Sequence, residues 1–309
     1  MENLLSAWKE FLNGKRKRKD VRTFETSLAD NIFDLHHSLR LHTYKHGPYL
    51  AFTIHDPKKR NIHKAKVRDR LLHHAIHRKL YPFYDNIFIT DSYSCRNFKG
   101  MHKAIDRFQC FFRSVSKNNH RTVWVLKCDI RKFFDSVDHH TLLEILKKKI
   151  ADSAIISLLE NIIASFEKTN GKGIPLGNLT SQLFANVYMN CFDQWVKHHL
   201  KAKWYIRYAD DFILMHHEKS VLEEYLNQIK FFLQDNLHLE LHPHKVSITT
   251  LASGVDFLGW VHFPHHRVLR TVTKRRMLKS LKINQKKETV ASYKGMLTWG
   301  NAHKISDMI

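Results

Sequence analysis

The sequence predicts an α+β fold, in which an antiparallel sheet is backed by amphipathic helices. Two apolar, strand-like runs lie far apart in the chain, at residues 123–126 and 204–215. The second run is typical of a β-hairpin, because a short polar turn separates two apolar stretches. Apolar residues recur at helical spacing over 141–165, 181–200 and 220–235. Helices that alternate with paired strands indicate this fold class.

The remaining elements are expected in chain order. A short helix within residues 1–22 is followed by the basic run Lys15–Lys19, which is either a solvated tail or a binding arm. Helical spacing over 66–80 should end at Pro82. After Pro264 the chain becomes strongly basic, and cations at helical spacing over 274–282 form either a solvated helix face or a binding face.

The net charge of the chain indicates which classes of function to expect. Lys and Arg number 51 against 29 Asp and Glu, a formal charge of +22. This excess indicates a nucleic-acid partner, with an anionic membrane surface as the rival interpretation. No run of about 18 apolar residues exists, so no membrane span is expected. The four cysteines lack the spacing of a disulfide framework or a zinc site, which fits a reducing, cytoplasmic location. The 24 histidines are expected at the surface or against phosphates.

Acidic residues stand at the ends of the strand-like runs. Asp129 follows the first run, and Asp210 and Asp211 interrupt the second. Adjacent carboxylates beside buried strands repel each other and lose water, so a divalent cation would stabilise them. Oxygen-only ligands indicate Mg²⁺, or alternatively Mn²⁺, and a third carboxylate fits two-metal phosphoryl displacement. A merely polar turn at Asp210–Asp211 is the competing interpretation.

These residues and several other motifs resemble those of reverse transcriptases. The similarity covers about residues 60–262 in the family's order. It is carried by fingers motifs at Lys66–Leu71 and Tyr93–Gly100, a first palm motif at Asp129–Val137, a dNTP-site loop at Gly173–Gln182, a catalytic hairpin at Tyr208–Asp211 and a primer-grip turn at Phe257–Trp260. It implies a right-hand polymerase with fingers and palm at 61–262, a short helical thumb at 263–309 and a basic extension at 1–60.

The resemblance implies roles for single residues at the metal and the sugar. Asp129 and Asp210 would bridge two metal ions, with Asp211 as a nearby ligand and the Ile130 carbonyl as a backbone contact. Phe134 would be the ring that excludes a 2′-hydroxyl. Phe133 and Phe134 alternate faces, so one ring should be core and position favours Phe134 as the gate.

It also implies cations near the triphosphate. One or two of Lys66, Arg68 and Arg70 would grip the incoming nucleotide, and the sequence does not choose among them. Lys245 matches the lysine that the family places near the leaving pyrophosphate, where it would act as a general acid. An ordinary surface lysine is the alternative.

The loop Gly173–Gln182 indicates which class of reverse transcriptase the chain resembles. Group II intron enzymes usually have Pro-Gln-Gly and Ser-Pro there, whereas this chain has Leu176 before Gly177 and Gln182 after Ser181. The whole loop is similar to that of the reverse transcriptases of diversity-generating retroelements, which copy a template RNA with errors at adenines. A glutamine at position 176 would hydrogen-bond the nucleotide and Leu176 cannot, so fidelity is expected to fall. A leucine that only fills space is the alternative.

The expected partners are template RNA, a cDNA or primer strand and dNTPs, with no membrane. Enzymes of this kind often work with a small basic ring-forming accessory protein, although no residue here marks that contact. A rival is a reverse transcriptase of another bacterial class, namely group II intron-like, retron or abortive-infection. A catalytically silent RNA-binding scaffold is a rival of another kind, and the intact Asp129, Asp210 and Asp211 argue against it.

Overall fold

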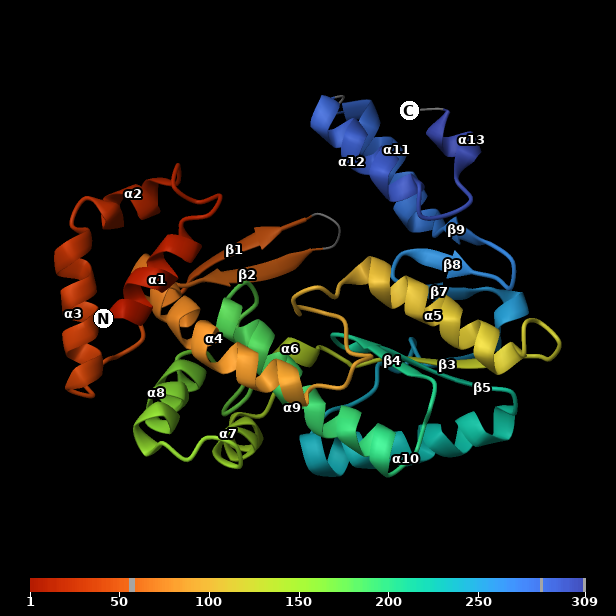
Figure 1. Cartoon of the computed structure of the whole chain (residues 1–309), viewed down its shortest axis with the longest axis horizontal. Helices are drawn as coiled ribbons and strands as arrows, with labels where there is room; N and C mark the ends of the chain where they lie inside the picture. The colour runs from red at the N-terminus through yellow and green to blue at the C-terminus, as the bar shows by residue number, and fades with distance from the viewer. Residues whose placement is uncertain (56–58, 284–285, 308–309) are drawn as a thin grey trace. The chain divides into compact units, whose positions relative to one another are not determined.

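A computed structural model describes residues 1–55, 59–283 and 286–307. Its contacts divide the chain into two compact units, which are considered separately. Unit 1 comprises Met1–Ile89, Arg131–Trp195 and Phe232–Glu240, and unit 2 comprises Thr90–Ile130, Val196–Phe231 and Leu241–Ile309. The elements of both are labelled in Figure 1.

A four-stranded antiparallel sheet organises unit 2, in the order β4-β5-β3-β6. Its strands are β3 (Trp124–Asp129), β4 (Tyr205–Tyr208), β5 (Asp211–His216) and β6 (Ser247–Thr250). The strand predicted at 123–126 and the hairpin predicted at 204–215 are therefore confirmed. Strands from three separate parts of the chain meet in this sheet, so the ends of β3 and β5 lie together.

Helix α5 (Met101–Ser116) covers one face of this sheet (Figure 1). Side chains alternate between the faces of a strand, so every second residue of β3 and β5 points to this helix. The core on this face consists of Phe108, Phe111, Phe112 and Val115 of α5 with Val125, Ile206, Ile213 and Met215 of the strands. Burial of each such side chain contributes about 1.5–3 kcal/mol. Helix α10 (Lys219–Leu237), predicted over 220–235, runs on the opposite side (Figure 1).

The C-terminal part of unit 2 is built around Trp260, which is almost fully buried. It begins with a short sheet of β7 (Val255–Phe257), β8 (Trp260–His262) and β9 (Arg267–Leu269). Helices α11 (Thr271–Ile283), α12 (Lys287–Leu297) and α13 (His303–Ser306) follow, so the helix predicted over the basic segment is confirmed. The turn Leu258–Gly259 between β7 and β8 has positive φ at both residues, as the tightest hairpin turns require.

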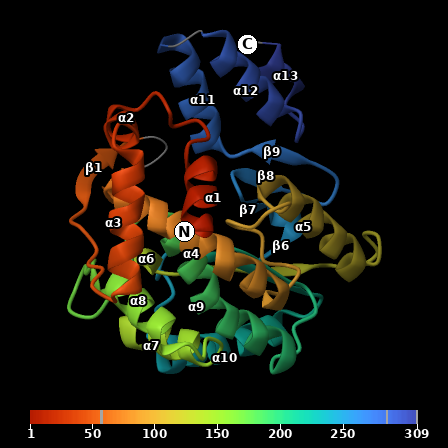
Figure 2. The same cartoon turned by 60° about the vertical axis from the view of Figure 1, so that its left-hand side comes forward.

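Unit 1 is mainly helical. Its elements are α1 (Glu2–Phe11), α2 (Lys19–Glu25), α3 (Leu28–Arg40), the hairpin β1 (Leu50–Ile54) and β2 (Arg60–Lys64), α4 (Val67–Ile87), α6 (Phe133–Ser136), α7 (His139–Lys147), α8 (Ser153–Ala164) and most of α9 (Leu179–His198). Helix α1 packs along α4 (Figure 2) and buries Leu4, Trp8 and Phe11. The helices predicted near the N-terminus, over 141–165 and over 181–200 are confirmed.

The prediction that Pro82 ends the fingers helix is wrong, because α4 continues through Pro82 to Ile87. Proline removes one backbone hydrogen bond from a helix interior, which is destabilising. Burial beyond the proline offsets that cost. Tyr84 is 1% exposed and stacks on Phe88, whose N–H donates to the Tyr84 carbonyl at 3.1 Å.

The expectation that histidines lie at the surface fails at three positions. His73, His139 and His262 are buried. Burial lowers the pKa of His73 to about 3 and that of His262 to about 4. Neutral imidazole serves there as a core ring, for example where His262 packs on Phe108 with ring centroids 4.5 Å apart.

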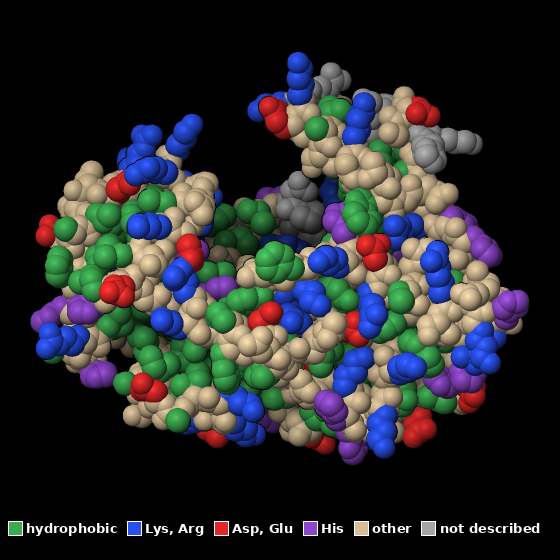
Figure 3. All heavy atoms as spheres, in the orientation of Figure 1, with side chains coloured by type: hydrophobic (Ala, Val, Ile, Leu, Met, Phe, Trp, Pro, Cys, Tyr) green, Lys and Arg blue, Asp and Glu red, His purple; other side chains and the backbone are tan. Residues whose placement is uncertain are grey.

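Lys and Arg residues occur in both units. Figure 3 shows Lys and Arg side chains scattered across the drawn face. Among the described residues, no helix combines the length and the apolar character needed to cross a bilayer.

Candidate active site

Strand pairing brings the predicted carboxylates to one end of the unit 2 sheet. Asp129, the last residue of β3, lies directly opposite Asp211, the first residue of β5, and Asp211 also pairs with Tyr208. Directly opposed residues of antiparallel strands point to the same face, with Cβ atoms about 4.5–5.5 Å apart. Asp210 stands in the adjoining turn. Three residues that are distant in sequence thus share one sheet edge.

The turn itself is a strained two-residue hairpin loop, Ala209–Asp210. Ala209 has φ +57°, in the left-handed region that glycine favours. The Ile130 N–H donates to the Asp210 carbonyl at 3.2 Å, which ties the end of β3 to the turn. The side chain of Ile130 is buried, so its predicted backbone role is compatible with a core position.

Arg207 supports this turn and was missed by the sequence analysis. Its side chain is buried, with 1% of the residue exposed. Its Nη1 donates to the Ala209 carbonyl at 3.0 Å, and its Nη2 donates to Ser92 Oγ at 3.1 Å. A guanidinium has several donors in a fixed plane, so it can fix the carbonyl of a strained residue. A charged residue inside an apolar strand, one position before the motif, was the signal that could have found it.

The carboxylates are held in a setting that disfavours their charge. Burial, followed by the neighbouring Asp129 and Asp211 charges, raises the pKa of Asp210 to about 6. Burial also raises the pKa of Asp211, with Asp129 and Asp256 acting in the same direction and Lys127 and Lys245 opposing. Asp211 Oδ1 is buried, and among the described residues it has no hydrogen-bond partner. A buried, unpaired carboxylate oxygen is costly unless a cation approaches it.

Lys245 forms an ion pair with Asp129, one of the predicted metal ligands. Its Nζ lies 2.8 Å from Asp129 Oδ1. The backbone supports this contact, because the His242 N–H donates to the Asp129 carbonyl at 2.8 Å and the Lys245 N–H donates to the His242 carbonyl at 3.0 Å. The lysine predicted near the leaving group thus lies beside a predicted metal ligand.

The donor set fits Mg²⁺ or Mn²⁺. Within the described ranges, no group of three or more His, Cys, Asp or Glu side chains is gathered closely enough to hold a metal ion. Mg²⁺ does not need such a cage, because it keeps several waters and binds through one or two carboxylates plus substrate phosphates. The carboxylates at the shared sheet edge and the unpaired Asp211 oxygen therefore favour a Mg²⁺ or Mn²⁺ site, although the described residues form no preformed cage of ligands.

A second group of predicted residues meets in unit 1, around Phe134. Phe133 is buried and Phe134 is half-buried, with their rings edge to face at 5.6 Å, so the expected division into a core ring and an accessible ring holds. The Ile174 N–H donates to the Phe134 carbonyl at 2.8 Å. This bond brings the loop Gly173–Gln182 beside Phe134.

The same loop is clamped to strand β2. The His63 N–H donates to the Leu176 carbonyl at 3.1 Å, and Asn178 Nδ2 donates back to the His63 carbonyl at 2.9 Å. Gly177 has φ +104°, and a Cβ there would lie 2.8 Å from Ile62 Cγ2, so the close approach requires glycine. Asn178 was missed, since nothing in its sequence context marks a clamp.

The remaining loop residues differ in exposure. Ser181 is buried near the start of α9, and Gln182 is exposed. The side chain of Leu176 is half-buried, and its carbonyl is bonded to β2.

The geometry separates the three fingers cations. Arg70 forms an ion pair with Asp20, and Arg68 donates to Ser38 Oγ at 2.9 Å. Lys66 is exposed, and in the described parts of the chain its side chain has no ion pair or hydrogen bond. Lys66 is therefore the candidate best able to meet a phosphate.

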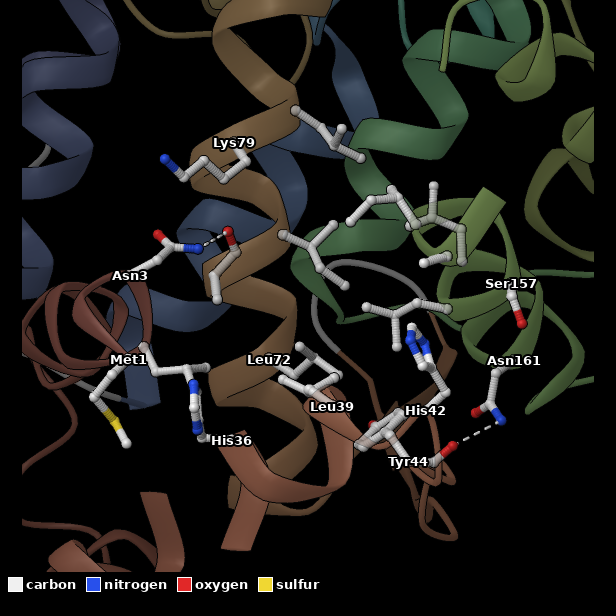
Figure 4. Close-up of a pocket in the computed structure, with 18 residues that line it drawn as sticks. Met1, Asn3, His36, Leu39, His42, Tyr44, Leu72, Lys79, Ser157 and Asn161 are labelled. Atoms are coloured by element: carbon white, nitrogen blue, oxygen red, sulfur yellow. Dashed lines mark hydrogen bonds between the residues drawn. The ribbon is translucent and has the colours of Figure 1, made fainter. Parts of the chain in front are cut away.

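An apolar cavity of about 420 Å³ lies elsewhere in unit 1, between α1, α3, α4 and α8 (Figure 4). Its rim is fixed by Asn161 Nδ2, which donates to the Tyr44 carbonyl at 3.1 Å, and by Asn3 Nδ2, which donates to the Ala75 carbonyl at 2.9 Å. No Asp or Glu and none of the predicted site residues lines it.

The carboxylates Asp129, Asp210 and Asp211 thus lie at one edge of a helix-covered antiparallel sheet. The family model described as "Reverse transcriptase (RNA-dependent DNA polymerase)" matches residues 54–262. The chain belongs to this family.

Curated relatives include Protein YkfC of Escherichia coli, 26% identical over an alignment of 242 positions, which covers 66% of this chain and 61% of that protein. The group II intron-encoded protein LtrA of Lactococcus lactis is 24% identical over 62% of this chain and 42% of its own length. The chain thus spans about two fifths to three fifths of these two relatives.

The fold is also that of solved right-hand polymerases. Apo telomerase of Candida tropicalis, truncated from the C-terminal domain, matches with a TM-score of 0.54 at 13% identity, covering 72% of this chain and 55% of that one. Telomerase of Candida albicans matches with a TM-score of 0.53 at 11% identity, covering 74% of this chain and 46% of that one. These likenesses confirm the predicted α+β right-hand fold.

Proposed function

We propose that this chain is an RNA-directed DNA polymerase that extends a primer on an RNA template with dNTPs. The observation that carries the proposal is the register of β3 and β5, which sets Asp129 opposite Asp211 with Asp210 in the adjoining turn. Family membership supports the same reaction. We retain fingers and palm at 61–262 and a thumb at 263–309 as the proposed division.

In this proposal, Asp129, Asp210 and Asp211 hold divalent ions, with the Ile130 carbonyl as a further ligand. When bound, such ions lower the charge repulsion at the reacting phosphate and acidify the attacking hydroxyl. Lys245 lies beside Asp129, where its ammonium can offset charge or donate a proton to the leaving group.

The unit 1 group would receive the nucleotide. Lys66 contacts the triphosphate, because Arg68 and Arg70 have partners within the fold. Phe134 abuts the sugar, and Leu176 with Gly177, Ser181 and Gln182 borders the base pair. The bond from Ile174 to Phe134 supports a common site for the sugar and the base.

The test is primer extension on an RNA template by purified protein. Asp129→Asn and Asp210→Asn should each lower DNA synthesis by orders of magnitude while RNA binding persists. Asp235→Asn, an exposed carboxylate on α10, is the matched control and should synthesise DNA normally. Near-wild-type extension by Asp210→Asn would overturn the proposal.

We further propose that the enzyme serves a diversity-generating retroelement and misreads template adenines. The support is the loop Gly173–Gln182, in which Leu176 offers no polar group to the nucleotide. Sequencing of cDNA made on a defined RNA should show errors concentrated opposite adenine. Equal error rates opposite all four bases would overturn this assignment and leave the polymerase proposal standing.

A second candidate is a reverse transcriptase of another bacterial class. The observation that favours it is the similarity to intron proteins, the group II intron-encoded protein LtrA among them. A template–variable repeat pair near the gene, differing at adenines, would support the retroelement proposal. An intron flanking the gene would support the second candidate.

A further inference from the structure

Phe98 is the most exposed large apolar side chain among the described residues, at 89%. It lies in unit 2, on the loop Tyr93–Gly100 that precedes α5. Its φ is +58°, and Cys95 in the same loop has φ +53°. Bulky residues rarely adopt this left-handed conformation. The loop therefore presents an aromatic ring to solvent in a strained backbone conformation, with no burial that would explain it.

The strain is maintained by a braced loop. The Gly100 N–H donates to the Tyr93 carbonyl at 3.0 Å and closes the loop at its base. Arg96 Nη1 donates to the Ser92 carbonyl at 3.1 Å, and Lys99 Nζ donates to the Thr90 carbonyl at 2.8 Å. Strained residues persist where the surroundings over-determine them, and such residues cluster at functional sites.

The base of the loop is attached to the strand that carries the acidic turn. Ser92 forms a parallel bridge with Arg207, and the Tyr93 N–H donates to the Arg207 carbonyl at 3.0 Å. The loop that bears Phe98 therefore flanks the Tyr208–Asp211 motif.

The surroundings of Phe98 are cationic and polar. Lys99 follows it, Arg96 stands two residues before it, and exposed Lys103 is in the first turn of α5. Protein-binding patches on soluble proteins are contiguous apolar areas of several hundred Å². A single ring between polar neighbours does not form one. It does suit a nucleobase, whose flat face stacks on an aromatic ring while an exposed cation such as Lys103 meets a phosphate.

We propose that Phe98 is a stacking platform for an unpaired base of the template strand as it approaches the acidic turn. This inference rests on the proposed polymerase function. It assigns to this chain a single-strand contact that depends on an aromatic ring at one position.

The experiment compares Phe98→Ala, Phe98→Trp and Phe98→Gly in the full chain, with Phe231→Ala as control. Phe231 is an exposed phenylalanine, at 68%, on α10 of the same unit. The probes are a fluorescent single-stranded RNA and a blunt RNA duplex, without dNTPs. Stacking is worth about 1–3 kcal/mol per base, so Phe98→Ala should weaken single-strand binding by about 5- to 150-fold. Phe98→Trp and the control should bind like wild type, and duplex binding should not change.

Phe98→Gly separates stacking from a structural role. Glycine adopts positive φ without strain, so this variant should unfold at a higher temperature than wild type and yet bind single-stranded RNA as weakly as Phe98→Ala. A lower unfolding temperature together with unchanged RNA binding would show that Phe98 serves the fold and would overturn the proposal.

Other outcomes are equally decisive. Unchanged single-strand affinity of Phe98→Ala overturns the proposal, as does an equal loss for single strand and duplex. In primer extension, Phe98→Ala should raise the KM for template and keep kcat. Failure of the polymerase proposal is recognised separately, because it would appear as DNA synthesis by Asp210→Asn, whatever the Phe98 variants bind.

Discussion

The Lys245 ammonium lies 2.8 Å from Asp129 Oδ1, so the side chain expected near the leaving group is the counterion of a predicted metal ligand. The same ammonium lowers the pKa of Asp210 and Asp211 against the raising effect of burial. One lysine thus stabilises three carboxylates that would otherwise repel one another. A divalent ion at this edge would share that role, which makes metal binding and the position of Lys245 interdependent.

Removal of this ammonium should make the protein more dependent on metal. In Lys245→Met the carboxylates lose a counterion, so the metal-free fold should lose up to about 1 kcal/mol, the usual worth of a partly exposed pair. Mg²⁺ should then raise the unfolding temperature more than in wild type. Lys219→Met, which breaks a 2.8 Å surface pair with Glu223, is the control and should show the wild-type response to Mg²⁺. An equal response in both variants would contradict the interdependence.

The contribution of Asp210 to metal-free stability should fall as pH rises, because burial raises the pKa of Asp210 from its usual 3.8 to about 6. The folded state binds the proton more tightly than the unfolded chain, so this contribution is fully present below about pH 4. It is lost as pH rises through about 6. The loss is at most about 3 kcal/mol, since one pKa unit corresponds to 1.36 kcal/mol.

Urea unfolding with a chelator at several pH values measures this effect. Asp210→Asn should remove this falling contribution, so its gain in stability over wild type should grow as pH rises towards 7, whereas Asp235→Asn should parallel wild type. Buried His73 and His262, whose pKa values are lowered, add the same rise with pH to all three proteins. Saturating Mg²⁺ should restore the stability that the metal-free wild-type protein loses at neutral pH through Asp210. A profile of Asp210→Asn that parallels wild type would show that another group titrates.

Arg207 should act as a positioning residue for the acidic turn. Arg207→Lys keeps the charge but cannot serve both the Ala209 carbonyl and Ser92 Oγ, so kcat should fall while the KM for template stays near wild type. Ala209→Gly relieves the positive φ and should stabilise the fold by roughly 1 kcal/mol. A double-mutant cycle on kcat measures the coupling of the two residues. Additive effects would mean that Arg207 does not act through the turn.

Phe134→Ala should admit ribonucleotides, whereas Phe133→Ala should mainly lower stability. Phe133 is 2% exposed, and a large-to-small core change of this kind costs about 3–5 kcal/mol. Phe134 is half-buried, so its loss should cost less stability. Incorporation of dNTP against rNTP by both variants tests the assignment. If Phe134→Ala keeps the wild-type preference for dNTP over rNTP, the Phe134 ring is not the group that excludes the 2′-hydroxyl.

Local patterns predicted the sheet edge well, because the relevant signals lie within short windows. The apolar runs beside Asp129 and around Tyr208–Asp211 indicated strands, and the order of motifs indicated the family. Long-range packing could not be predicted in this way. Helix α4 passes through Pro82 because Tyr84 is buried beyond it, and neither partner of that packing is marked in the sequence.

The sequence also could not show which side chains pair with one another. The three cations of the fingers motif are equivalent in sequence, and they differ only because Asp20 and Ser38, far upstream, engage Arg70 and Arg68. The role of Asn178 likewise depends on its hydrogen bond to His63 of β2, which its sequence context does not indicate. Such pairings depend on tertiary contacts between segments that carry no shared motif.

The final prediction concerns fidelity at Leu176. Its carbonyl is bonded to the His63 N–H at 3.1 Å, so Leu176→Gln changes only what the side chain offers and leaves the loop clamped. A glutamine there could hydrogen-bond the incoming nucleotide and should lower misincorporation, most visibly opposite template adenines. A neutral hydrogen bond contributes about 0.5–1.5 kcal/mol, so the error rate should fall by about 2- to 13-fold.

The control for this prediction is Leu179→Gln, the same change three residues later, also at a half-buried position. Error spectra of wild type and both variants are measured on one RNA template. Equal improvement in the two variants would mean that polarity anywhere in the loop restores accuracy. If wild type is inaccurate at adenine and Leu176→Gln changes nothing, the infidelity must arise elsewhere, with exposed Gln182 at the end of the loop as the next residue to exchange. Accurate copying of adenine by wild type would remove the retroelement assignment while the carboxylate edge still supports a polymerase.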